Sequence, residues 1–155
     1  MSDFDPNSFL EANYTEANDT KLVPVPEGTY NAIPEKVGIR TGVIKKGDRA
    51  GEAFVTLDIT WEIDDEALRQ HLDRSKVTIN QGVMLDIAAD GKSLDFSKGK
   101  NITLGKVREA LGLNTPGQPF SCQMIPGKPA KIQVKHRLDG EDIYSDVKAV
   151  LKYGS

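Results

Sequence analysis

The chain has 155 residues and a formal net charge of −3 at pH 7, with 38% hydrophobic and 28% charged residues. This composition fits one ordinary folded domain and leaves no room for a second hydrophobic core. The chain holds no run of 18 apolar residues and begins with an acidic segment where a signal peptide would be basic, so we expect neither a membrane span nor secretion. Cys122 is the only cysteine, which excludes an internal disulfide.

The charge is distributed unevenly along the chain. Residues 1–20 carry five acidic side chains and no lysine or arginine. Residues 21–155 therefore hold all 20 basic side chains and the other 18 of the 23 acidic ones, a balance of +2. We predict an acidic N-terminal arm over 1–20 and a single domain over 21–155. Such an arm is either a solvated, poorly ordered terminus or a segment that mimics a polyanion or docks a partner.

The domain opens with a hydrophobic alternation of period two, which is typical of strands. We predict a first strand over 29–39, in which Gly38 would permit a bulge. A second strand is predicted over 54–63, with Trp61 on the apolar side and therefore in the core. Between the two strands lies a loop with three glycines and the basic residues Lys45, Lys46 and Arg49.

The middle of the chain alternates between helical and extended patterns. The spacing predicts a short helix over 65–72 and a third strand over 77–87. Apolar residues then recur at helical spacing over 101–114, which predicts a helix with Asn101 or Thr103 as its N-cap.

The chain closes with two strands over 130–153 that turn at Asp139 and Gly140, a strong hairpin signal. The resulting order is strand, strand, strand, helix, strand, strand. This is the order of the OB-fold, so we predict a mainly β protein: a five-stranded OB-like Greek-key barrel with one helix between strands 3 and 4. In that fold the loop between strands 1 and 2 borders the binding face, and here this loop is the basic one.

No catalytic or metal-binding motif is found in the sequence. The two histidines, His71 and His136, do not combine with Cys122 in any familiar metal-ligand spacing. The basic loop lacks the spacing of a phosphate-binding loop. We therefore expect no cofactor, no metal and no catalytic residue. An enzyme that uses Cys122 with His136 stays as a third reading of the sequence.

Cations and aromatic residues form the remaining pattern. On the predicted fourth strand, polar positions alternate with apolar ones and comprise Lys131, Gln133, Lys135 and Arg137. On the predicted fifth strand, Tyr144, Lys148 and Lys152 are spaced by even numbers of residues and would therefore share one face. Single-stranded nucleic acid binds to such cations together with exposed rings, and Phe54 and Tyr144 have the parity expected of exposed rings. The alternatives are that lysines decorate any outward strand face and that Phe54 simply begins its strand.

Two stretches carry a family resemblance: EANYTEANDTKLVPVPEGTYNAIPEKVGIRTGVIKKGDRAGEAFVTLDITWEI and GKPAKIQVKHRLDGEDIYSDVKAVLKY. They resemble small tailed-phage proteins thought to be single-stranded DNA-binding proteins with an OB-fold. The likeness spans roughly Glu11 to Tyr153 and rests mainly on the PEGTY entry into the first strand and on the closing hairpin. Several phage proteins of this functional class recruit replication partners through an acidic C-terminal tail, whereas here the acidity lies at the N-terminus.

Residues and resemblance together predict a non-enzymatic protein that binds single-stranded DNA in phage replication or recombination, in the cytoplasm of the infected bacterial host. The loop residues Lys45, Lys46 and Arg49 would bind phosphates. Bases would stack on Phe54 and Tyr144. The track of cations would continue along Lys131, Lys135, Arg137 and Lys148. The arm would either fold back and compete with DNA for the basic face or dock phage or host replication proteins. The alternative is a virion-associated or interaction β-barrel that binds protein through a sheet edge.

Overall fold

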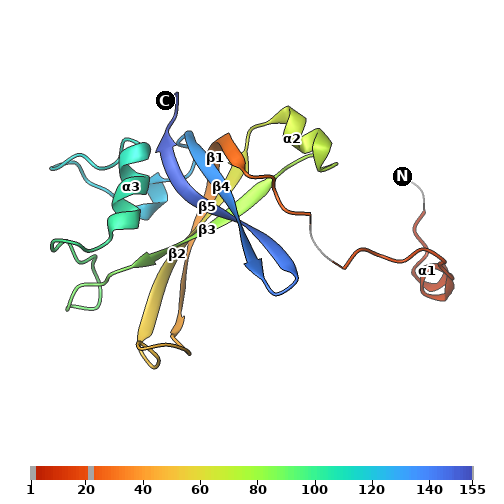
Figure 1. The fold of residues 1–155 in the computed structure, drawn as a ribbon, viewed down its shortest axis with the longest axis horizontal. Coiled ribbons are helices and arrows are strands. Elements are labelled where there is room, and N and C mark those ends of the chain that lie inside the picture. The colour runs from red at the N-terminus through yellow and green to blue at the C-terminus, as the bar shows by residue number, and fades with distance from the viewer. Residues whose placement is uncertain (1–2, 21–22, 155) are drawn as a thin grey trace.

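The computed structural model describes residues 3–20 and 23–154 (Figure 1). It is mainly β, with five antiparallel strands in one sheet of order β3-β2-β1-β4-β5. The strands are β1 (Gly28–Val43), β2 (Ala53–Ile63), β3 (Thr78–Leu85), β4 (Ala130–Asp139) and β5 (Asp142–Lys152). The helical segments are α1 (Pro6–Glu11), α2 (Glu66–His71), α3 (Ile102–Ala110) and the 3₁₀ turn η1 (Cys122–Met124).

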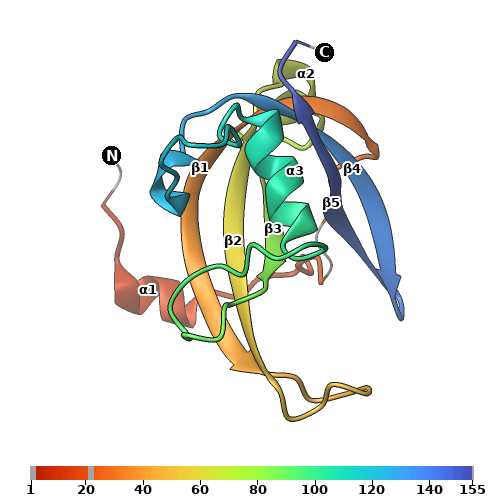
Figure 2. The same cartoon turned by 90° about the vertical axis from the view of Figure 1, so that its left-hand side faces the viewer.

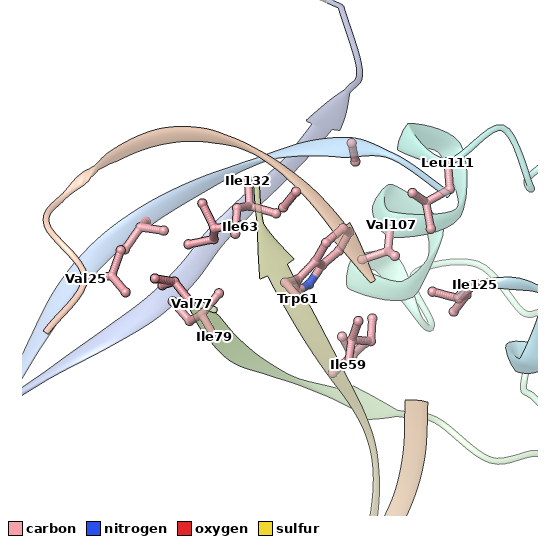
Figure 3. Close-up of a cluster of buried hydrophobic side chains, with 14 of the residues drawn as sticks. Val25, Ile59, Trp61, Ile63, Val77, Ile79, Val107, Leu111, Ile125 and Ile132 are labelled. Atoms are coloured by element: carbon pink, nitrogen blue, oxygen red, sulfur yellow. The ribbon is translucent and has the colours of Figure 1, made fainter. Parts of the chain in front are cut away.

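The core is built around β2, whose alternate residues face inward as the sequence predicts. Trp61 has no exposed surface and is the largest fully buried side chain. Its indole Nε1 donates a hydrogen bond to Oε1 of Gln81 on β3 at 2.9 Å. Because a buried indole N–H without an acceptor is costly, this bond fixes the ring within the core. Val107 of α3 and Ile132 of β4 belong to the same cluster (Figure 3).

β1 is longer than predicted and its bulge lies elsewhere. The pairing with β2 continues to Val43, and the register shifts between Pro34 and Lys36, so that Glu35 is the extra residue. The expectation of a bulge at Gly38 is therefore wrong. Pro34, which is paired with Trp61, has no N–H to donate to the ladder, and this favours the irregularity at the next residue. Glu35, displaced by the bulge, forms an ion pair with Lys76.

The two predicted helices of the body are both present. Asp65 caps α2 by accepting from the backbone N–H of Leu68 at 3.0 Å. Asn101 stands at the N-cap position of α3 as expected, but its side chain makes no capping bond. Instead, its amide nitrogen donates to the carbonyls of Asp86 and Asp95 at 2.9 and 3.0 Å. Asn101 therefore ties the start of α3 to the segment that leaves β3.

The predicted barrel is not closed by hydrogen bonds. Within the described residues no ladder joins β3 to β5, the two outer strands of the sheet. These strands nevertheless approach each other, and α3 packs against both of them (Figure 2). α3 buries Leu104 and Val107 against the core. The sheet therefore curls around one core while keeping two edges.

We expect Trp61→Ala to lower the free energy of unfolding by about 3–5 kcal/mol, because it removes a large buried ring and its hydrogen bond. Urea denaturation followed by circular dichroism measures the change. Ile39→Ala is the matched control, since Ile39 is 58% exposed on the same sheet, and it should cost less than about 1 kcal/mol. Equal losses in both variants would contradict the assignment of the core.

Candidate nucleic-acid interface

Two hairpins project from the same end of the body, formed by β1 with β2 and by β4 with β5 (Figures 1 and 2). The turn of the first hairpin carries Lys45, Lys46 and Arg49, all exposed. Gly47 and Gly51 adopt φ values of +88° and +91° there, a conformation that favours glycine. Arg49 pairs with Glu52 at 2.7 Å. Among the described residues neither Lys45 nor Lys46 has an ion pair, so both ammonium groups face solvent.

Phe54 lies on the outward face of the first hairpin, as its parity predicts. Its ring lies directly on Gly42 across the strand pair, where an added Cβ would come within 2.6 Å of Cζ. The guanidinium of Arg40 lies 5.8 Å from the ring centroid. Arg40 also donates to both carboxylate oxygens of Asp58, at 3.1 and 3.3 Å. We call Arg40, Phe54 and Asp58 the Arg40 group.

The second hairpin carries a similar arrangement. Arg137 on β4 pairs in register with Tyr144 on β5, and its guanidinium lies 4.9 Å from the ring centroid. Its Nε also donates to Asp146 at 2.8 Å. Lys135 shares this face, because it is paired in register with Asp146. We call Arg137, Tyr144 and Asp146 the Arg137 group.

A β-bulge changes the predicted grouping on β5. The register passes from Gln133 with Ala149 to Val134 with Val147, so Lys148 is the extra residue. Parity reverses at this point, and Lys152 pairs in register with Ala130 rather than standing on the face of Tyr144. The prediction that Tyr144, Lys148 and Lys152 share one face is therefore wrong, because a period-two pattern does not survive an inserted residue.

The structure separates the remaining predicted cations into two surfaces. On β4, Lys131, Lys135 and Arg137 keep one parity without interruption, as predicted. Lys148 lies elsewhere, in a cleft of about 470 Å³ between α3 and β5 that Lys106 and Lys152 also line. Arg137 and Tyr144 border a different cleft, of about 720 Å³, opposite Ile79 and Asn80 of β3.

Arg40 is the residue of this surface that the sequence analysis missed. It is exposed and sits at an alternate position of β1, beside Gly38 and Gly42. The sequence contained a signal for this role of Arg40. A hairpin that turns at the basic loop places Arg40 opposite Thr56, and therefore between Phe54 and Asp58 on the neighbouring strand. Predicting β1 to end at Ile39 placed Arg40 in the loop and hid this pairing.

The segment before β1 holds the second hairpin in place. Val25 is 4% exposed, its N–H donates to Oγ of Ser145 at 2.7 Å, and its carbonyl accepts from Nε2 of His136 at 2.7 Å. The backbone N–H of His136 donates to the carboxylate of Glu27 at 2.8 Å. This hydrogen bond holds the pKa of Glu27 below its ordinary value, because it stabilises the ionised carboxylate.

The acidic arm contains a short helix that the sequence analysis did not predict. Asp5 caps α1 by accepting from the backbone N–H of Asn7 at 3.1 Å. The rings of Phe4 and Phe9 lie 5.2 Å apart, and those of Phe9 and Tyr14 lie 6.3 Å apart. These rings contact one another rather than the core, and Phe4, Phe9 and Tyr14 are 64%, 55% and 68% exposed. In Figure 1, α1 lies well away from the sheet.

Cys122 and His136 are held in different surroundings. Cys122 packs against the hydrophobic core, and burial raises the pKa of its thiol. His136 instead uses its ring to contact the carbonyl of Val25. Across 3–20 and 23–154, histidine, cysteine and acidic side chains form no cluster of three with metal-ligand geometry.

Family models and curated proteins give no guide to this surface. No protein-family model matches the chain, and a search of curated proteins finds no match. No helix in the described part of the chain has the length and apolar character needed to cross a membrane. Function is therefore inferred from the side chains that the fold brings together.

The hydrogen bond between Glu27 and the backbone of His136 should make the stability of the fold depend on pH in the acid range. Because the folded-state pKa of Glu27 lies below its unfolded value, its stabilising effect is present above roughly pH 4.3 and is lost as the pH falls further. Glu27→Gln should therefore flatten the fall in melting temperature between about pH 4.5 and 3. Glu16→Gln, which alters an exposed carboxylate of the arm, is the control and should leave the wild-type profile unchanged. A wild-type profile in Glu27→Gln would contradict the prediction.

Proposed function

We propose that this protein binds single-stranded DNA in phage replication or recombination without catalysing a reaction. The observation that carries the proposal is the placing of an arginine beside an aromatic ring on each projecting hairpin, Arg40 with Phe54 and Arg137 with Tyr144. Single-stranded nucleic acid binds by stacking its bases on exposed rings while cations contact its phosphates. Each hairpin supplies both groups on an outward face.

Lysines near the two groups extend the proposed contact to phosphates. Lys45 and Lys46 stand at the turn of the first hairpin, and Lys135 stands beside the Arg137 group. All three are exposed. Lysine side chains on this turn suit the irregular backbone of a single strand, since their ammonium groups can follow phosphates in several positions. Arg49, which pairs with Glu52, would have to exchange that partner for a phosphate.

The strand order supports the finer proposal of an OB-type barrel. An OB-fold keeps β1 between β2 and β4 and brings β3 beside β5, and both relations are present here as pairing or contact. In that fold the nucleic acid crosses the outer face of β2 and β3 between two loops. The corresponding face here carries small and polar residues, including Thr60, Asn80 and Gly82.

A second role, in protein docking, is favoured by the arm. Its exposed rings lie among acidic residues, a composition suited to a basic, partly apolar groove on another protein. Leu10, which is 80% exposed, adds to this apolar surface. We propose phage or host replication proteins as the partners of the arm, while the hairpins bind DNA.

Strand preference and salt dependence test the DNA-binding proposal. If about five cations contact phosphates, the logarithm of affinity should fall with the logarithm of salt concentration with a slope of roughly −3.5, a loss of about a hundredfold between 50 and 200 mM. Fluorescence anisotropy with single- and double-stranded oligonucleotides measures both quantities. Duplex DNA should bind far more weakly, because its bases are not free to stack. Equal affinities for the two forms, or an affinity insensitive to salt, would refute the proposal.

Tyr144→Ala tests the stacking role. Removing the ring should weaken single-stranded DNA binding by about 1–3 kcal/mol, and the free energy of unfolding should change by less than about 1 kcal/mol because Tyr144 is 41% exposed. Tyr153→Ala is the control, since Tyr153 is also exposed but lies beyond the end of β5. If the two variants bind DNA equally well, no base stacks on Tyr144.

A further inference from the structure

The Arg40 and Arg137 groups share one arrangement. In each, the arginine comes from the first strand of the hairpin, and both the ring and the carboxylate come from the second. Phe54 and Asp58 flank the residue opposite Arg40 on β2, whereas Tyr144 stands opposite Arg137 and Asp146 follows two positions later. The same three chemical groups therefore occur on both hairpins.

The ion pairs of both groups are accessible from solvent. The side chains of Arg40 and Asp58 are 57% and 26% exposed, and those of Arg137 and Asp146 are 54% and 46% exposed. An exposed pair of this kind contributes little to folding. Each carboxylate nevertheless neutralises an arginine on the proposed binding surface. The hydrogen bond with Asp58 also raises the pKa of Arg40, because it stabilises the charged guanidinium.

A third arginine shows that a ring contact does not require a carboxylate. Arg108 on α3 lies over the ring of Phe120 at 4.1 Å from its centroid. Its Nε donates to the backbone carbonyl of Leu113 at 3.0 Å. This arginine is fixed at the end of α3 by a neutral acceptor. Among the arginines that contact a ring, the paired carboxylates thus distinguish Arg40 and Arg137 from Arg108.

We propose that Asp58 and Asp146 are intramolecular competitors of nucleic acid: each occupies, in the free protein, the guanidinium that a DNA phosphate takes over in the complex. The inference rests on the proposed function, since it assumes that the hairpins contact DNA. A carboxylate and a phosphate bind to the same edge of a guanidinium, so the two cannot share it fully. Asp58 and Asp146 both occupy the Nε side of their arginine, so a phosphate that binds on that side must displace the carboxylate, and each aspartate lowers the affinity.

The test is a double-mutant cycle on each hairpin, read by the affinity for a single-stranded oligonucleotide. Asp58→Asn keeps the shape of the side chain and removes its charge, so it should tighten binding about fivefold, the size expected for releasing one exposed ion pair. In the background of Arg40→Gln the same substitution should tighten binding less than about twofold, because no guanidinium is released. Asp146→Asn with Arg137→Gln should behave in the same way.

Matched controls separate competition from the general effect of removing negative charge. Asp48→Asn and Asp142→Asn each remove one charge from the same two hairpins, and neither aspartate has an ion pair among the described residues. They should change the affinity less than twofold. A gain in Asp58→Asn that equals the gain in Asp48→Asn, or that persists with Arg40→Gln, would overturn the inference. Weaker binding by Asp58→Asn would also overturn it, by showing that the carboxylate orients the arginine for DNA.

The same measurements distinguish failure of the inference from failure of the proposed function. Wild-type binding with no extra gain in the aspartate variants refutes the competition alone. Binding that appears only in Asp58→Asn/Asp146→Asn supports competition strong enough to mask the site. No binding by the wild type or by this double variant, with circular dichroism confirming that both are folded, refutes the DNA-binding function and the inference together.

Discussion

The architecture depends on one strand that serves two partners. β1 pairs with β4 through its first five residues, Gly28 to Ala32, and with β2 from Ala32 to Val43. Both parts of β1 must present their apolar side chains to the same core, while their backbones form hydrogen bonds with different strands. The bulge at Glu35 lies just beyond the point where the partner on one side ends. β1 thereby sets the directions of both hairpins and the position of every side chain on them.

The sequence predicted most of this fold because its dominant signal is local. Alternating hydrophobic and polar residues identified the strands, helical spacing identified α3, and the pair Asp139 and Gly140 identified the final turn. The two bulges were missed or misplaced because a single inserted residue leaves hydrophobicity almost unchanged while reversing parity beyond it. The sequence also did not predict that β3 and β5 lack a hydrogen-bonded ladder in the described part of the chain, since this depends on the curvature of the whole sheet.

The candidate surface was only partly predictable, for a different reason. Outward parity correctly placed Phe54 and the cations of β4, because that judgement needs only one strand. The contacts of Arg40 and Arg137 with carboxylates need the register between two strands, and register follows from turn geometry. Likewise, the ring cluster of the arm needs the backbone of α1, a helix too short to leave a periodic pattern. Side-chain contacts between two strands are thus harder to predict from a sequence than the strands themselves.

The two unpaired edges of the sheet have a consequence for how the protein behaves at high concentration. An exposed edge offers backbone donors and acceptors to any other edge, which is a common start of aggregation. On β5 this edge carries a bulge at Lys148 and a second lysine at Lys152, and α3 packs against both edge strands. Bulges and lysines disfavour the addition of another strand. The β5 edge is therefore protected against the addition of another strand both by its shape and by its charge.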